Sequence, residues 1–180
     1  SDQDDVWLED KLSREMAKMR ELEARYGKDT PLLVFSDAKV VDAELNPLDE
    51  SLFHRTKIDP RRLLPRQLIL QNVANGNTML FNAALRDLAK PIPSNAFMHD
   101  HWLMLVASVF GKVACVQEPT LLYRQHGGNV LGGAKGGAGY YWRRVLQGRA
   151  ALRRRLYGNV RQVEAFVERF GEKSPEEFRA

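Results

Sequence analysis

Short apolar runs of strand length alternate along this chain with longer segments of helical periodicity, and this alternation limits the folds available to it. The runs 32–35 and 113–116 each hold four consecutive apolar residues, a pattern typical of buried strands. The segments 8–22 and 102–110 are long enough to form helices. Strands alternating with helices predict an α/β or mixed layered domain.

The two longest helical segments differ in character. In the first, apolar residues recur at a spacing of three or four positions before Gly27, a typical helix stop: Leu8, Leu12, Met16, Met19 and Leu22. This pattern predicts an amphipathic helix. The segment 102–110 is apolar on all sides and ends at Gly111, which predicts a buried helix with a glycine C-cap.

Shorter elements complete the prediction. Asp59 and Pro60 are expected to open a helix, with the aspartate as N-cap and the proline at the first helical position. A further helix is expected from Asn82. Additional strands are predicted over 38–41, 78–81, 112–117 and 121–125.

Composition places the chain among globular proteins. Hydrophobic residues make up 44% and charged residues 28% of its 180 positions, and no apolar run is long enough to span a bilayer. The start is acidic and shows no signal-peptide pattern. Cys115 is the only cysteine, which excludes an internal disulfide and fits a cytoplasmic, reducing location.

The net charge of +4 is unevenly distributed. Seven arginines fall between positions 143 and 161, a segment without an acidic residue, and they indicate an anionic partner. The core is expected to end near Asn129, giving a domain over 1–132 and a glycine-rich linker with a basic helical tail over 133–180. Two interpretations of 140–161 stay open: a helix resting on an anionic membrane surface, with Trp142, Val145, Leu146, Leu152 and Leu156 on one side, or a solvated or protein-packed helix.

Three carboxylates crowd the start of the chain, at Asp2, Asp4 and Asp5. Such density suits Mg²⁺ or Mn²⁺, which prefer oxygen ligands and share them with substrate phosphates. The alternative is capping of the helix that follows, which explains one or two of the three.

A second candidate site opens the buried helix at His99-Asp100-His101-Trp102. An aspartate at the edge of an apolar element can accept a proton from a substrate hydroxyl, although it can also serve as a plain N-cap. The two histidines lie two positions apart and do not share a helical face, so a zinc site is not expected.

Five blocks of the chain resemble, in order and spacing, the family 2 glycosyltransferases, most closely their rhamnosyltransferase-like branch. They are Ser-Asp-Gln-Asp-Asp-Val-Trp at 1–7, Phe-Ser-Asp-Ala at 35–38, Asn-Gly-Asn-Thr-Met-Leu-Phe-Asn at 75–82, His-Asp-His-Trp at 99–102 and Tyr-Arg-Gln-His-Gly-Gly-Asn-Val-Leu-Gly at 123–132. The resemblance covers residues 1–132 and leaves out the tail.

The resemblance implies a GT-A fold, a Rossmann-like mixed sheet with flanking helices. It implies an inverting transfer of a sugar, rhamnose in this branch, that depends on Mg²⁺ or Mn²⁺. In the family's DxD motif the first acid lies near the donor ribose and the second meets the metal, roles that fall on Asp2 and Asp4. The general base falls on Asp100, and His126 matches a histidine that meets the metal or pyrophosphate in some members.

Other residues of these blocks are expected around the substrates. Asp5, Gly76, Asn77 and Arg124 are assigned to the nucleotide-sugar donor, and His99 and Trp102 to the acceptor. Two departures from the family pattern concern these residues: His99 stands where glutamate is common, and Asn77 where a small residue or cysteine is frequent. For Trp102 a place in the core is an equally good interpretation.

The resemblance implies a nucleotide-diphospho-sugar and a glycan or lipid-linked acceptor as partners. The basic tail adds the inner face of a membrane, and no nucleic acid is expected. In the family the nucleotide base is held by strands that precede the DxD motif. We therefore expect the N-terminal nucleotide-binding half to be missing, the fragment alone to be inactive, and the open sheet edge to favour self-association. Two alternatives remain, a metal-dependent phosphohydrolase and a non-catalytic membrane or interaction module.

Overall fold

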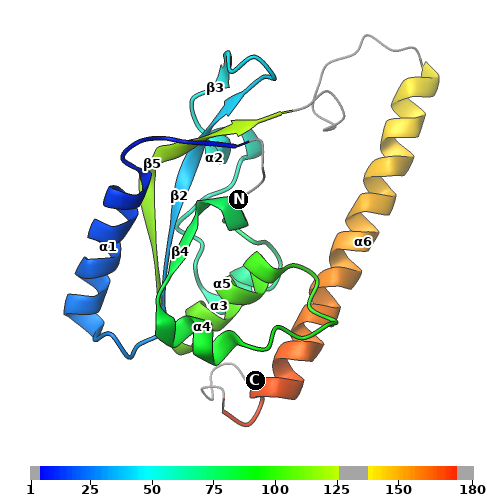
Figure 1. Cartoon of the computed structure of the whole chain (residues 1–180). Helices are drawn as coiled ribbons and strands as arrows, with labels where there is room; N and C mark the ends of the chain where they lie inside the picture. Colours follow the sequence, from blue (N-terminus) through cyan, green and yellow to red (C-terminus); the bar gives the residue numbers. More distant parts are fainter. Residues whose placement is uncertain (1–4, 126–137, 174–180) are drawn as a thin grey trace.

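The computed structural model describes residues 5–125 and 138–173; in the last helix, side chains are described from residue 152 onward, residue 155 excepted. The chain folds as a mixed sheet of five strands with flanking helices, which confirms the α/β class (Figure 1). In chain order the elements are β1 (Val6–Trp7), α1 (Lys11–Tyr26), β2 (Leu32–Val41), β3 (Pro47–Asp49), α2 (Leu52–Thr56), α3 (Pro65–Leu68), the 3₁₀ turn η1 (Gly76–Thr78), β4 (Met79–Phe81), α4 (Ala83–Ala89), α5 (His99–Phe110), β5 (Lys112–Arg124) and α6 (Ala138–Phe170).

The central strand of the sheet is β2. It pairs in parallel with β5 along one edge, and antiparallel with β4 and then β3 along the other. The short β1 extends the sheet beyond β5. The runs 112–117 and 121–125, predicted as two strands, form the single strand β5, whose register with β2 shifts near Pro119. Proline has no N–H to donate, so the ladder is disturbed there without ending.

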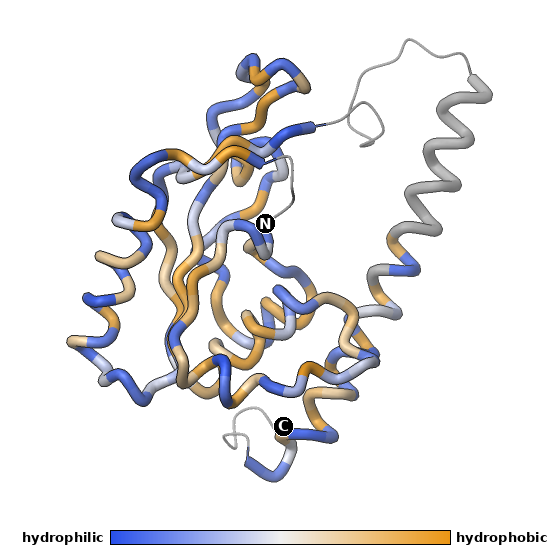
Figure 2. Tube along the Cα trace, in the orientation of Figure 1, coloured by the Kyte–Doolittle hydropathy of each residue, from blue (hydrophilic) through white to orange (hydrophobic). Residues whose placement is uncertain are grey.

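The two faces of the sheet are covered by different helices. Leu32 and Val34 of β2 pack with α1, whereas Leu33 and Phe35 pack with α5. This alternation follows from the two-residue period of a strand. Helices α3 and α4 lie on the same side as α5 (Figure 1). The strands and α5 are mainly apolar in Figure 2, as expected for the interior of a layered domain.

The buried face of α1 agrees with the predicted apolar stripe only in its second half. Leu12 and Met16 are exposed, while Lys11 and Glu15 are buried with Met19 and Leu22. The Lys11 ammonium lies 2.5 Å from the Glu15 carboxylate. That carboxylate also accepts a hydrogen bond from Ser36 of β2 at 3.0 Å. Burial of the pair is possible because each charge meets a polar partner.

The core continues into the last helix, beyond the limit expected near Asn129. Phe166 and Phe170 of α6 both contact the indole of Trp102 in α5, with ring centroids 5.9 Å apart in each pair. Gly158 of α6 permits a close approach, because a Cβ there would lie 2.4 Å from the ring of Phe97. The C-terminal half of α6 therefore belongs to the packed body, while its first turns extend away from the body (Figure 1).

Two predicted helix starts had different outcomes. Asn82 caps α4 as expected, accepting a hydrogen bond from the backbone N–H of Leu85 at 3.0 Å. The helix predicted at Asp59 is absent from that place, and the next one begins at Pro65. Asp59 instead accepts hydrogen bonds from the backbone and the guanidinium of Arg61, which close a local turn. None of the described helices is long and apolar enough to cross a membrane.

Candidate functional site

Three segments that lie far apart in the sequence meet near the start of α5. The side-chain amide of Asn77 in η1 donates a hydrogen bond to the carboxylate of Asp5. The neighbouring Gly76 packs against α5, since a Cβ on it would lie 3.0 Å from Nε2 of His99 and 3.5 Å from Cβ of Asp100. Five of the residues predicted for substrate binding and catalysis are thus brought together. We refer to these five residues as the Asp5–Asp100 cluster.

The fold explains how these segments meet. Pairing of Val6 with Leu122 places β1 beside β5, and Asp5 immediately precedes β1. The turn η1 leads directly into β4, whose Met79 pairs with Phe35 of the central strand. The helix α5 begins at His99 and packs against the same face of the sheet as Phe35. Sheet pairing therefore fixes Asp5 and Asn77, and helix packing fixes Asp100.

Asp100 occupies the first turn of α5 and is only 5% exposed. Its Oδ1 accepts a hydrogen bond from the backbone N–H of His101 at 2.6 Å. The N-cap residue Met98 supplies no side-chain hydrogen bond to the helix. The free N–H groups and the dipole of a helix N-terminus stabilise a negative charge, so the position favours a carboxylate.

A groove of about 330 Å³ opens beside Asp100. One wall is formed by the segment 72–75 and another by the residues that lead into α5, and α6 closes the third side. Its lining residues are Asn72, Ala74, Asn75, Phe97, Met98, Asp100, His101, Arg154 and Asn159. The groove therefore combines one buried carboxylate, one cation, several amides and two half-exposed apolar side chains. Such a mixture suits a polyhydroxylated ligand with an anionic or apolar part.

Asn77 carries an unused acceptor. The residue is 9% exposed, and its Oδ1 has no hydrogen-bond partner among the described residues. Buried polar atoms normally find a partner, so this oxygen is a candidate for contact with a ligand. The amide oxygen of Asn77 and the carboxylate of Asp5 are both oxygen ligands of the kind that Mg²⁺ or Mn²⁺ binds.

The predicted metal ligands themselves cannot be placed. Asp2, Asp4 and His126 lie outside the described residues. Within 5–125 and the described side chains of α6, no three His, Cys, Asp or Glu side chains come together as a metal site. Their roles at the metal and the ribose stay predictions.

Two further predicted residues lie elsewhere. Trp102 is fully buried between α5 and α6, and its indole N–H donates to the carbonyl of Ala89 at 3.1 Å. It is a core residue without surface for an acceptor, which was the alternative interpretation. Arg124 ends β5, and its guanidinium donates to the carbonyl of Ala43 at 2.7 Å. Its predicted contact with the donor stays a prediction.

Asp37, the aspartate of the block Phe-Ser-Asp-Ala, forms hydrogen bonds at the start of α2. One oxygen of Asp37 accepts hydrogen bonds from the backbone N–H groups of Leu52 and Phe53, at 3.0 and 3.2 Å, and so caps α2. The other accepts one from the hydroxyl of Ser51 at 2.5 Å. Both carboxylate oxygens of Asp37 are therefore engaged in hydrogen bonds within the fold.

Sequence reasoning missed the contribution of α6. Arg154 and Asn159 line the groove beside Asp100, although they belong to the segment predicted as a tail. A usable signal was present: Asn159, Gln162, Phe166 and Phe170 follow helical spacing, and such a stripe indicates a face that packs against protein.

No model of a known protein family, no curated protein and no solved structure matches the chain.

Proposed function

We propose that the chain catalyses an inverting, metal-dependent transfer of a sugar from a nucleotide-diphospho-sugar to an acceptor hydroxyl, on a GT-A type fold. The observation that supports this proposal is the Asp5–Asp100 cluster. Its residues come from three blocks of the chain that resemble family 2 glycosyltransferases, separated by up to 95 positions in the sequence. Their meeting at one place is what a shared substrate site requires.

In the proposed reaction Asp100 acts as the general base. The acceptor oxygen forms a bond to the anomeric carbon while its proton passes to the Asp100 carboxylate. The bond between the sugar and the diphosphate breaks, and the nucleoside diphosphate leaves with the electron pair. His99 and the groove beside Asp100 hold the acceptor, and no covalent intermediate with the protein is needed.

The donor lies on the other side of the cluster, toward Asp5, Gly76 and Asn77. Because Gly76 has no side chain, the donor side of the cluster can pack closely against His99 and Asp100. A bound Mg²⁺ or Mn²⁺ supplies charge neutralisation for the departing diphosphate. Asp2 and Asp4, with His126, are the residues proposed to hold it and the ribose. The oxygen atoms of Asp5 and Asn77 are ligands of the type that such an ion prefers.

The residues that line the groove beside Asp100 support a class of acceptor. Phe97 and Met98 offer apolar surface and Arg154 offers a cation beside the proposed base. These features support an acceptor glycan that carries a lipid or an anionic group. Rhamnose as the transferred sugar rests on the family resemblance alone.

The decisive experiment is a donor panel. The chain, together with any residues that its gene encodes on either side, is incubated with UDP-, GDP- and dTDP-sugars, a lipid-linked glycan extract, and either Mn²⁺ or EDTA. We expect release of nucleoside diphosphate that needs both Mn²⁺ and the acceptor, with radiolabelled sugar recovered in the acceptor.

Other results would overturn the proposal. Release of inorganic phosphate without sugar transfer indicates a phosphohydrolase. Absence of turnover with every donor, by a correctly folded protein that binds no nucleoside diphosphate, indicates a non-catalytic module.

A further inference from the structure

The helix α6 and the neighbouring segment 61–70 carry large apolar side chains that are exposed to solvent. Each of them is between 49% and 71% exposed: Leu64, Leu70, Leu152, Leu156, Tyr157 and Val160. We call this area the α6–loop surface. Scattered exposed apolar residues are normal, but a group of six on two adjoining segments indicates an interaction site.

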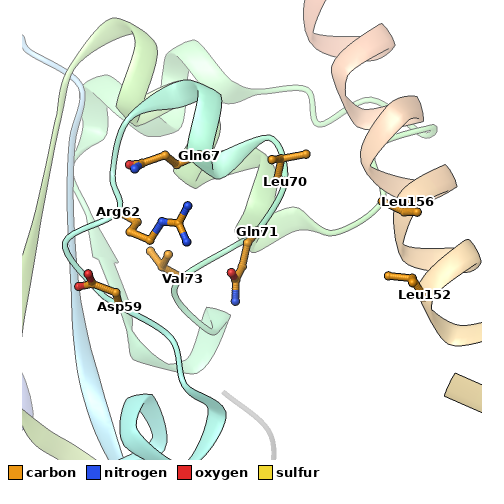
Figure 3. A pocket seen from close by; sticks show the side chains of 8 residues that line it. All are labelled: Asp59, Arg62, Gln67, Leu70, Gln71, Val73, Leu152 and Leu156. Carbon is orange, nitrogen blue, oxygen red and sulfur yellow. The ribbon is translucent and has the colours of Figure 1, made fainter. Parts of the chain in front are cut away.

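The two segments of this surface are held together. The side-chain amide of Asn159 in α6 donates a hydrogen bond to the carbonyl of Leu70 at 2.9 Å. Between them lies a groove of about 300 Å³. Leu152 and Leu156 project from α6 toward Leu70, and Arg62 reaches into the same space (Figure 3).

The charge of the α6–loop surface is almost entirely positive. Five exposed arginines lie on the same two segments and form no ion pair with another described residue: Arg62, Arg66, Arg153, Arg154 and Arg161. Two acids adjoin this surface: the exposed Glu164, one turn after Val160 on α6, and Asp59, whose carboxylate is engaged by the side chain of Arg61 at 2.9 and 3.1 Å. Those hydrogen bonds also lower the pKa of Asp59.

We propose that the α6–loop surface docks on an anionic lipid bilayer. The surface combines exposed apolar side chains with arginines. Such a combination suits the boundary of a bilayer, where acyl chains meet negatively charged headgroups. The aliphatic stems of arginine can lie along the apolar surface while the guanidinium groups reach phosphates. This inference does not depend on the reaction proposed for Asp100.

Electrostatics favours this occupant over a second copy of the chain. A symmetric dimer through the same surface would bring the five arginines of each copy face to face, and like charges across an interface cost free energy. A bilayer with anionic lipid supplies the opposite charge at high density.

The test is co-sedimentation with vesicles of phosphatidylcholine alone and of phosphatidylcholine with 30% phosphatidylglycerol, a composition chosen on the order of cellular anionic content. We expect binding to the anionic vesicles only, weakened as salt rises from about 0.1 to 1 M, where the Debye length falls from about 10 to 3 Å.

Paired variants separate the two components of the contact. Arg62→Gln with Arg66→Gln should lower the partition coefficient about 25-fold, because each basic residue near the surface contributes about fivefold. Leu152→Gln with Leu156→Gln should lower it at least about tenfold through lost apolar burial. Matched controls lie across the sheet, on α1 and in the turn that follows it: Arg20→Gln with Lys28→Gln for charge, and Leu12→Gln with Met16→Gln for apolar surface. Both controls should bind as the unchanged chain does.

The proposal has clear contrary outcomes. Equal binding to neutral and anionic vesicles, absence of binding to either, or equal losses in the matched controls would overturn it. So would a dimer in sedimentation velocity that the Leu152 and Leu156 substitutions dissociate, since the surface would then be an interface between copies. Thermal unfolding of each variant checks that the fold is intact.

Discussion

The side-chain carbonyl of Gln162 in α6 accepts a hydrogen bond from the backbone N–H of Met98, the residue that precedes α5, at 3.3 Å. It also accepts one from the N–H of Phe97 at 3.1 Å. Gln162 is 1% exposed, so both bonds are shielded from water. The last helix therefore positions the segment that carries Asp100.

Replacing Gln162 tests this link. Gln162→Leu should lower the free energy of unfolding by about 1–3 kcal/mol, because it removes two hydrogen bonds that each contribute about 0.5–1.5 kcal/mol. Urea denaturation measures the change. The control Glu168→Leu, at an exposed position on the same helix, should change stability by less than about 0.5 kcal/mol. Equal effects in the two variants would show that the Gln162 bonds do not hold the start of α5.

Asp100→Asn tests the proposed base. The amide keeps the shape of the carboxylate but cannot take a proton, so transfer should fall about 10²- to 10⁴-fold. Binding of nucleoside diphosphate with Mn²⁺ should change little. Asp29→Asn, at an exposed position, serves as the matched control. Turnover close to that of the control, in a folded Asp100 variant, would remove Asp100 from the reaction.

Asp4→Ala and Asp5→Asn test the proposed metal side. Each should weaken Mn²⁺-dependent binding of nucleoside diphosphate at least about tenfold while changing little in EDTA, since the lost carboxylate charge matters only when the ion is present. Isothermal titration calorimetry under both conditions measures the difference. Equal losses with Mn²⁺ and EDTA would instead assign these aspartates to folding.

Cys115 provides a test of burial that does not depend on function. Burial raises the pKa of its thiol to about 12 from a usual value of 9.0, with Asp37 and Glu118 contributing. At pH 8 the native thiolate fraction should therefore be roughly a thousandfold below that of the unfolded chain, and alkylation correspondingly slow. Rapid labelling of the native chain at pH 8 would contradict the buried position.

The same shift predicts how stability responds to alkaline pH. The folded pKa lies above the unfolded one, so the neutral thiol is favoured by folding. The contribution is complete below about pH 9 and is lost as the pH rises toward about 12. Cys115→Ala should remove this part of the pH dependence in urea titrations between those values.

The sequence by itself determined the class of most elements and several of their ends. Apolar runs at 32–35 and 113–116 predicted strands, and a helix was predicted from Asn82, where α4 begins, because these signals act within a few residues. The blocks that resemble a glycosyltransferase family also named Asp5, Asn77 and Asp100 before the structure placed them together. Local signals were sufficient for the strands and helices, and the family resemblance supplied the site residues.

Tertiary structure decided which faces are buried and which segments meet. The periodicity of α1 favoured Leu12 and Met16 as core residues, yet the fold buries Lys11 and Glu15 because Ser36 and Thr120 from two strands satisfy them. Such compensation comes from residues far away in the chain, and no local pattern records it.

The packing of the end of the last helix was likewise decided only by tertiary structure. For 140–161 the arginines and the spacing allowed either a membrane-bound or a protein-packed helix, and the membrane contact there is a proposal. Beyond that segment, Phe166 and Phe170 pack against Trp102. Burial of these aromatic rings requires the partner surface of α5, which exists only once the sheet has formed beneath it. That packing brings Arg154 and Asn159 to the groove beside Asp100.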